Sequence, residues 1–116
     1  MEEARILELL KRADQAKQNA YAPYSGFRVG AAVMTKSGKI YSGCNVENAS
    51  YGATVCAERV ALFKAISEGE RDFLAIAITS DGKEPAYPCG ICRQVLCEFN
   101  PEMEVIVSGK DFGRCV

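Results

Sequence analysis

The sequence predicts an α/β protein with three layers, in which helices cover both faces of a mixed β-sheet. Three segments have apolar residues at helical spacing, and four others have the apolar and β-branched character of strands. These segments alternate along the chain in the order α-β-β-α-β-α-β. A chain of 116 residues supports one compact core, so we expect residues 1–116 to form a single domain.

The first predicted element is an amphipathic helix from residue 2 to about residue 20, which ends before Pro23. Its first turn is acidic, and its apolar positions follow helical spacing: Ile6, Leu9, Leu10, Ala13 and Ala16. The apolar stripe is narrow and the polar face carries both signs of charge. We therefore interpret the stripe as a core face rather than a membrane-binding or partner-binding surface.

A β-hairpin is predicted next, with strands at 27–35 and 40–46 on either side of a turn at Lys36-Ser37-Gly38-Lys39. The small residues Gly30-Ala31-Ala32 leave one face of the first strand bare. Close packing of the first helix explains this, and close approach of a ligand to the backbone is the alternative.

The second half of the chain predicts two more helices and two more strands. One helix runs from Thr54, as its N-cap, to about Gly69, and the other runs from Cys89 to about Phe99 before Asn100-Pro101. The strands are expected at 73–79 and 103–107. The apolar positions of the earlier helix are Val60, Leu62, Phe63 and Ile66.

Composition excludes several classes of function. Fourteen basic and fifteen acidic residues give a net charge of −1, which disfavours nucleic acid and anionic membranes as partners. The N-terminus lacks an apolar stretch of signal-peptide length, so a cytoplasmic location is expected. The chain has no histidine, which eliminates Ser-His-Asp catalysis and histidine metal sites. Its six cysteines are then candidates for metal binding or catalysis.

Cysteines open two of the predicted helices, in Cys56-Ala57-Glu58 and in Pro88-Cys89-Gly90-Ile91-Cys92. A helix N-terminus stabilises a thiolate, the form of cysteine that binds zinc. Three thiolates leave the fourth position of a tetrahedral zinc open, as in catalytic sites. The pattern therefore predicts one zinc ion per chain, held by Cys56, Cys89 and Cys92.

Glu58 lies two residues after the first thiol, where its carboxylate can lean over the metal without binding it. We expect Glu58 to take a proton from the attacking water, deliver it to a ring nitrogen of the substrate and later protonate the departing amine. Both halves of the zinc-deaminase signature are present, with Cys56 where some members have histidine.

Each half of the pattern also has a simpler explanation. Cys89 and Cys92 alone could be a redox pair or half of a structural zinc site, and Glu58 alone could be a partner of the helix dipole. A closed four-cysteine site would need Cys44, Cys97 or Cys115. Cys97 lies roughly 140° round the helix from Cys92, so we expect it to be a core thiol. The sequence does not place Cys44 or Cys115.

Four stretches of the chain resemble the small cytidine deaminases. They are residues 24–32 (YSGFRVGAA), 44–51 (CNVENASY), 54–59 (TVCAER) and 88–95 (PCGICRQV). The resemblance implies an α/β/α fold with about five strands, a homotetramer with active sites at subunit contacts, and zinc on the three cysteines named above. It also implies deamination of cytidine and 2′-deoxycytidine to uridine and 2′-deoxyuridine, with release of ammonia, in pyrimidine salvage.

The resemblance extends to individual residues. It implies that Glu58 is the proton shuttle, that Asn45 and Glu47 bind the ribose hydroxyls, that Phe27 lies against the base and that Tyr51 reaches a neighbouring subunit's site. The chemistry of the residues agrees in part. Asn45 and Glu47 share one face of an extended segment, so they can bind one sugar together. Arg59, beside Cys56, can offset the negative charge of three thiolates, a role that the resemblance also implies.

Relatives of this type continue into a C-terminal segment whose aromatic residue covers a neighbour's site, and that role is not transferred to Phe112. We accordingly expect a more open pocket and a raised KM. Three other functions compete. They are a blasticidin-type deaminase of another cytosine compound, a non-catalytic thiol or zinc module, and an editing enzyme on RNA or single-stranded DNA, which the charge disfavours.

Overall fold

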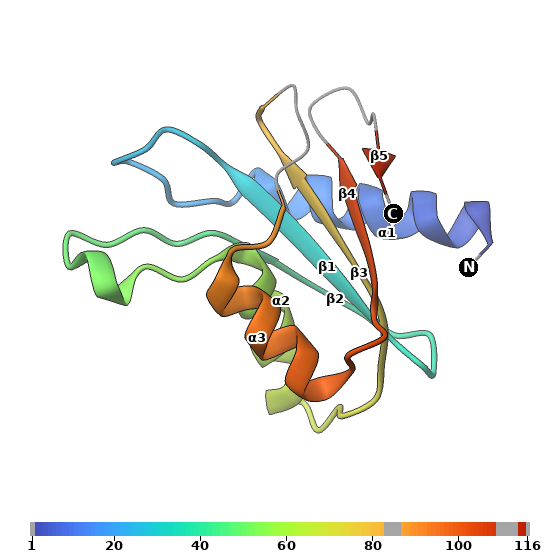
Figure 1. The fold of residues 1–116 in the computed structure, drawn as a ribbon. Helices are drawn as coiled ribbons and strands as arrows, with labels where there is room; N and C mark the ends of the chain where they lie inside the picture. Colours follow the sequence, from blue (N-terminus) through green and yellow to red (C-terminus); the bar gives the residue numbers. More distant parts are fainter. Residues whose placement is uncertain (1, 83–86, 109–113, 116) are drawn as a thin grey trace.

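Five strands form one mixed sheet in the order β2-β1-β3-β4-β5, with α1 on one face and α2 and α3 on the other (Figure 1). The computed structural model describes residues 2–82, 87–108 and 114–115. The elements are α1 Glu3–Lys17, β1 Val29–Thr35, β2 Ile40–Cys44, the short 3₁₀ helix η1 Tyr51–Ala53, α2 Ala57–Ser67, β3 Phe73–Ser80, α3 Gly90–Phe99, β4 Glu104–Ser108 and β5 Arg114–Cys115.

This architecture confirms the predicted three-layer α/β fold with a mixed sheet. β1 pairs antiparallel with both β2 and β3, β3 pairs parallel with β4, and β4 pairs antiparallel with β5. The first four strands are those expected from the sequence pattern. β5 has only two residues, which is too short for a strand periodicity to be recognised in the sequence. Only the resemblance to the small cytidine deaminases implied a fifth strand. Phe112 lies outside the described residues.

α1 packs against the sheet through the apolar stripe that its spacing predicts, apart from Ala16, which is only half-buried. A methyl group on Gly30 would lie 2.0 Å from the Ala13 carbonyl oxygen, so only glycine allows this close approach of helix and strand. Helix packing therefore explains the small residues of β1. The helix ends at Lys17, about three residues earlier than predicted. None of the helices within the described ranges has the length and apolarity needed to cross a membrane.

α2 covers the opposite face with a row of alanines one helical turn apart, Ala57, Ala61 and Ala65, together with Leu62. Phe63, one of the apolar positions noted in the sequence, is directed outward by this row and is 46% exposed. Val60 and Ile66 are half-buried. Gly43 of β2 permits the close approach, since a methyl group there would lie 2.5 Å from the Ala61 nitrogen.

The start of α2 differs from the prediction. Thr54 is not the N-cap, because Val55 pairs with Val46 through two backbone hydrogen bonds of 2.9 Å and keeps the chain extended as far as Cys56. Cys56 is the N-cap. The Thr54 hydroxyl instead accepts a hydrogen bond from the Asn48 N–H at 3.2 Å. The pairing places the first cysteine of the motif beside the segment that carries Asn45 and Glu47.

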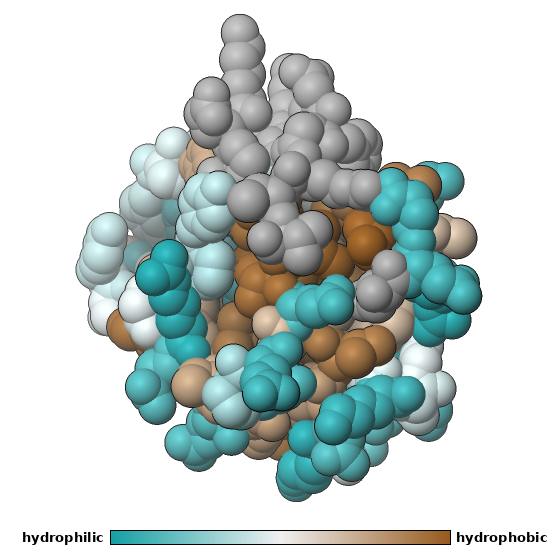
Figure 2. All heavy atoms as spheres, turned by 45° about the vertical axis from the view of Figure 1, so that its right-hand side comes forward, coloured by the Kyte–Doolittle hydropathy of each residue, from teal (hydrophilic) through white to brown (hydrophobic). Residues whose placement is uncertain are grey.

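Cys97 is exposed, so its prediction as a core thiol is also wrong. It does point away from Cys92, but it faces an apolar groove rather than the core. The groove has a volume of about 340 Å³ and is lined by residues of α3, β4 and their flanks, among them Leu96, Cys97, Met103 and Val105. Apolar surface is visible on this side of the molecule in Figure 2. Cys44 is half-buried at the end of β2, and burial raises the pKa of its thiol.

Candidate active site

Three thiols meet where α2 and α3 begin. Cys56 and Cys89 are the N-cap residues of the two helices, and Cys92 lies in the first turn of α3. All three sulfur atoms lie within 4.8 Å of one another, and Sγ of Cys56 is 3.8 Å from Sγ of Cys89. The two helix starts thus unite cysteines that are 33 positions apart in the sequence.

This cluster fits a zinc ion. Two sulfurs bound at 2.3 Å to a tetrahedral zinc lie about 3.8 Å apart, which is the separation of Cys56 and Cys89. Hydrogen bonding from the Cys92 thiol, assisted by Arg59, lowers the pKa of Cys56 to about 5. The same hydrogen bond to Cys56 raises the pKa of Cys92 in the metal-free protein. A thiolate is therefore already present in the cluster, and its negative charge favours binding of a zinc ion.

Arg59 is the neighbouring cation. Its Nη2 lies 3.7 Å from Sγ of Cys56 and 3.4 Å from the carbonyl oxygen of Thr54. The hydrogen bond to Cys56 is the main cause of its raised pKa. Its Nε is buried and has no hydrogen-bond partner in the described part of the chain. Arg59 thus lies where the sequence places it, beside the sulfurs.

Glu58 is almost completely buried, with 5% of its surface exposed, next to the thiols. Burial raises the pKa of its carboxyl, and the negative charge of Cys56 adds to this effect, while Arg59 opposes it. A carboxyl whose pKa is raised by burial holds a proton more readily than a surface glutamate does, which suits a group that must accept a proton and then release it.

Asn45 and Glu47 both face the segment that precedes β1. The Asn45 amide donates to the Phe27 carbonyl oxygen at 3.0 Å, and its Oδ1 accepts from the Val29 N–H at 2.9 Å. Oε1 of Glu47 accepts from the N–H groups of Tyr24 and Ser25 at 3.0 and 3.1 Å. Asn45 and Glu47 thus lie on one face as predicted. In this structure both side chains form hydrogen bonds with the backbone of residues 24–29.

Two adjoining cavities contain most of the predicted site residues. The inner cavity, of about 270 Å³, is lined by Phe27, Asn45, Glu47, Cys56, Glu58 and Cys89, among others. The outer cavity, of about 650 Å³, shares Glu47, Cys56 and Cys89 and adds Tyr51 and Arg59. Cys92 is buried beneath them and lines neither. Tyr51 stands apart from the inner cavity, with 92% of its surface exposed.

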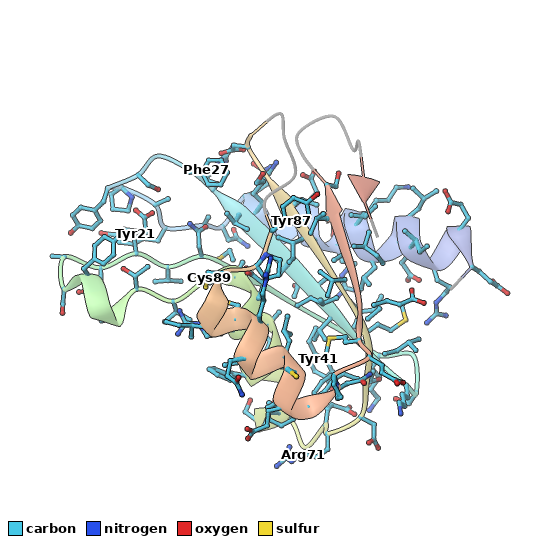
Figure 3. The ribbon with its side chains drawn as sticks, in the orientation of Figure 1. Tyr21, Phe27, Tyr41, Arg71, Tyr87 and Cys89 are labelled. Atoms are coloured by element: carbon cyan, nitrogen blue, oxygen red, sulfur yellow. The ribbon has the colours of Figure 1, made fainter. Side chains whose placement is uncertain are left out.

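Two further residues of this region, Tyr87 and Ser25, were not predicted from the sequence. Tyr87 lines both the inner cavity and the apolar groove, and in Figure 3 Phe27, Tyr87 and Cys89 lie at the same end of the sheet. The hydroxyl of Ser25 donates to Oε2 of Glu47 and accepts from the Phe27 N–H at 3.0 Å. Ser25 lies within a stretch that resembles known proteins, and Tyr87 directly precedes the second cysteine motif. Their position within or beside these stretches was the only signal in the sequence that could have identified them.

The fold, the three-thiol cluster and the buried glutamate define a protein of the zinc-binding deaminase class. The family model described as "Cytidine and deoxycytidylate deaminase zinc-binding region" matches residues 4–108, and the chain belongs to this family.

Similar proteins and structures agree. The chain is 59% identical over 93 residues to a cytidine deaminase of Halalkalibacterium halodurans, with 80% of this chain and 70% of that protein covered. It is 49% identical over 104 residues to one of Sporosarcina psychrophila, with 89% and 76% covered. The crystal structure of a cytidine deaminase from Burkholderia pseudomallei superposes with a TM-score of 0.92 at 46% identity, over 99% of this chain and 91% of that one.

Proposed function

We propose that the protein is a hydrolase that converts cytidine and 2′-deoxycytidine to uridine and 2′-deoxyuridine with release of ammonia. One observation carries the proposal: Glu58 and the cysteine cluster share the inner cavity with Phe27, Asn45 and Glu47. The cavity thus combines the groups of a zinc deaminase with an aromatic ring and polar groups suited to a nucleoside.

Cys56, Cys89 and Cys92 hold one zinc ion per chain. When bound, zinc supplies the Lewis acidity that makes water a nucleophile at neutral pH. Glu58 accepts a first proton from the water and passes it to a ring nitrogen of cytosine. It then takes the second proton from the oxygen now bonded to the ring carbon and passes it to the amine, which leaves as ammonia while the carbon–oxygen double bond forms. Its burial and raised pKa support this role. Arg59 limits the negative charge on Cys56 through its hydrogen bond to that sulfur.

The wall of the inner cavity recognises the substrate. Phe27 lies against the base, and Asn45 and Glu47 bind the ribose hydroxyls. Each of these two side chains keeps bonding capacity beyond the backbone bonds it makes, because an amide nitrogen has two hydrogens and a carboxylate has about four lone-pair directions. Hydrogen bonding by Ser25 lowers the pKa of Glu47 and keeps it an anionic acceptor.

The active protein is a homotetramer in which each chain supplies one domain and sites are shared between subunits. The exposure of Tyr51 supports this, since a ring that is 92% exposed on one chain has apolar surface left for a partner. The outer cavity supports it too, because it lies open above the thiols and enclosing a nucleoside needs further walls.

Pyrimidine salvage in the cytoplasm is the setting that fits this chemistry. The five cysteines whose side chains the structure describes are free thiols, the state maintained in a reducing compartment.

A direct assay tests the activity. The purified, zinc-loaded protein is incubated with cytidine, and loss of the amine is followed by ultraviolet absorbance with and without a zinc chelator. Parallel reactions contain 2′-deoxycytidine and blasticidin S, and Glu58→Gln is the matched inactive control. We expect chelator-sensitive turnover of both nucleosides. Turnover of blasticidin S alone would instead identify the rival deaminase.

A further inference from the structure

Residues 24–29, the Phe27 loop, supply Phe27 and Val29 to the wall of the inner cavity, and only Val29 of the loop belongs to a helix or strand. On the cavity side, the Phe27 N–H donates a hydrogen bond to the Ser25 hydroxyl at 3.0 Å, and the Asn45 amide donates one to the Phe27 carbonyl oxygen at 3.0 Å. The Phe27 backbone is thus anchored on both sides by side chains. Arg28, the next residue, is anchored on the far side of the loop.

Arg28 is joined to Asp81, which follows β3, by four hydrogen bonds. Its Nε lies 2.8 Å from Oδ2 of Asp81 and its Nη2 lies 3.2 Å from Oδ1. The backbone N–H of Arg28 donates to Oδ2 at 3.3 Å, and the Asp81 N–H donates to the Arg28 carbonyl oxygen at 3.1 Å. Because backbone as well as side chain takes part, this pair fixes the main chain directly after Phe27.

The carboxylate of Asp81 also binds a third element. Lys17, at the end of α1, is buried, and its Nζ lies 3.5 Å from Oδ1 of Asp81, 3.0 Å from Oδ1 of Asp14 and 3.4 Å from the Ser80 carbonyl oxygen. Hydrogen bonding by Arg28 lowers the pKa of Asp81, with a smaller contribution from Lys17, so the carboxylate is ionised at neutral pH. Asp81 therefore connects α1, the end of β3 and the Phe27 loop.

We propose that Asp81 is a positioning residue for substrate binding, which holds Phe27 in the wall of the inner cavity through Arg28. The inference rests on the proposed function only where it assigns the base to Phe27. Asp81 itself lines neither cavity at the site, so it acts on the substrate only through the loop.

Kinetics of Asp81→Asn test the effect on binding. The substitution keeps the shape of the side chain and removes its charge, so we expect KM for cytidine to rise about fivefold, with kcat within about twofold and the zinc content unchanged. Asp14→Asn is the matched control, because Asp14 also pairs with Lys17, whereas the Arg28 guanidinium bonds to Asp81 and Gln18. It should leave KM unchanged. An equal rise of KM in both variants would overturn the proposal.

Asp81→Asn also removes a charged partner of the buried Lys17, and this loss could unfold the variant. Arg28→Gln then supplies a second test. It breaks the same pair and leaves the Asp81 charge facing Lys17, so the same rise in KM is expected. In a Phe27→Ala background, Arg28→Gln should raise KM little further, since the pair acts through Phe27. A full additional fivefold rise there would show that Arg28 acts elsewhere.

A readout that does not depend on activity separates this inference from the proposed function. The chain contains no tryptophan, so Phe27→Trp places a single fluorescent indole in the loop. Adding Arg28→Gln should shift its emission to the red and increase quenching by acrylamide, while adding Asp14→Asn should do neither. Unchanged emission would overturn the positioning role even in an active enzyme, and a red shift would support it even if cytidine were not the substrate.

Discussion

The floor and the wall of the inner cavity are held by different means. The floor is formed by Cys56, Glu58 and Cys89, with Cys92 buried beneath it. All four lie in the N-cap position or first turn of a helix, so the backbone of α2 and α3 sets their positions. The wall contains the Phe27 loop together with Asn45 and Glu47. The side chains of Asn45, Glu47 and Asp81 hold this loop by hydrogen bonds.

The difference teaches where rigidity is needed. Reaction chemistry tolerates little displacement, and helices built on a packed sheet provide that precision. Recognition of the substrate can be adjusted through a loop that is held in place by hydrogen bonds from individual side chains. Substitutions in the floor should therefore remove zinc or turnover, whereas substitutions in the wall should change KM and leave zinc in place.

The largest effect is expected at the metal ligands. Replacing Cys56, Cys89 or Cys92 by serine should remove the bound zinc and reduce activity to that of the metal-free protein, because a tripod with two thiolates lacks the charge and geometry to retain the ion. Zinc content by atomic emission provides the measurement. Cys97→Ser is the control, and an equal loss of zinc from it would show that the ligand set is wrong.

Glu58→Gln should separate the two functions of the floor, which are zinc binding and proton transfer. The amide is isosteric and cannot carry the proton, so kcat should fall by at least ~10²-fold while zinc and fold are retained. Steady-state kinetics on the zinc-loaded variant measure this. Near-normal turnover would exclude Glu58 from proton transfer.

Glu47→Ala examines the wall. Loss of a charged acceptor for a ribose hydroxyl, together with loss of the bonds to Tyr24 and Ser25, should cost roughly 1.5–3 kcal/mol in kcat/KM on cytidine, with zinc content unchanged. An unaltered kcat/KM would mean that the sugar is bound elsewhere. Loss of zinc would contradict the division between wall and floor.

The smallest effect is expected at Tyr51, which belongs to neither region in one chain. Tyr51→Ala should raise KM by less than about tenfold through loss of a contact supplied to a neighbouring subunit, with kcat and zinc retained. Tyr21→Ala, an exposed tyrosine that lines neither cavity, is the control. Sedimentation of the zinc-loaded protein should show a tetramer, and an active monomer would defeat the shared-site model.

Much of the floor was predictable from the sequence, and little of the wall was. The spacing of Cys56 to Glu58 and of Cys89 to Cys92 defines local geometry once a helix begins there, so the sequence determines which side chains share a turn. The corrections concern what lies around each helix. Thr54 fails to cap α2 because Val55 pairs with Val46, and Phe63 and Cys97 are exposed because no other part of the described chain covers them.

By itself, the sequence determined the elements whose information is local: the apolar stripe of α1, the turn between β1 and β2, and the start of α3 at Cys89. Only the tertiary structure decided which distant residues meet. The 53 positions between Arg28 and Asp81 are bridged by the sheet, and no pattern along the chain indicates that pairing. The meeting of Cys56 and Cys89, 33 positions apart, was indicated only by the chemistry of the combined zinc-deaminase signature. Helical and strand periodicity acts over a few residues, whereas these contacts depend on strand order and on how closely the helices approach the sheet.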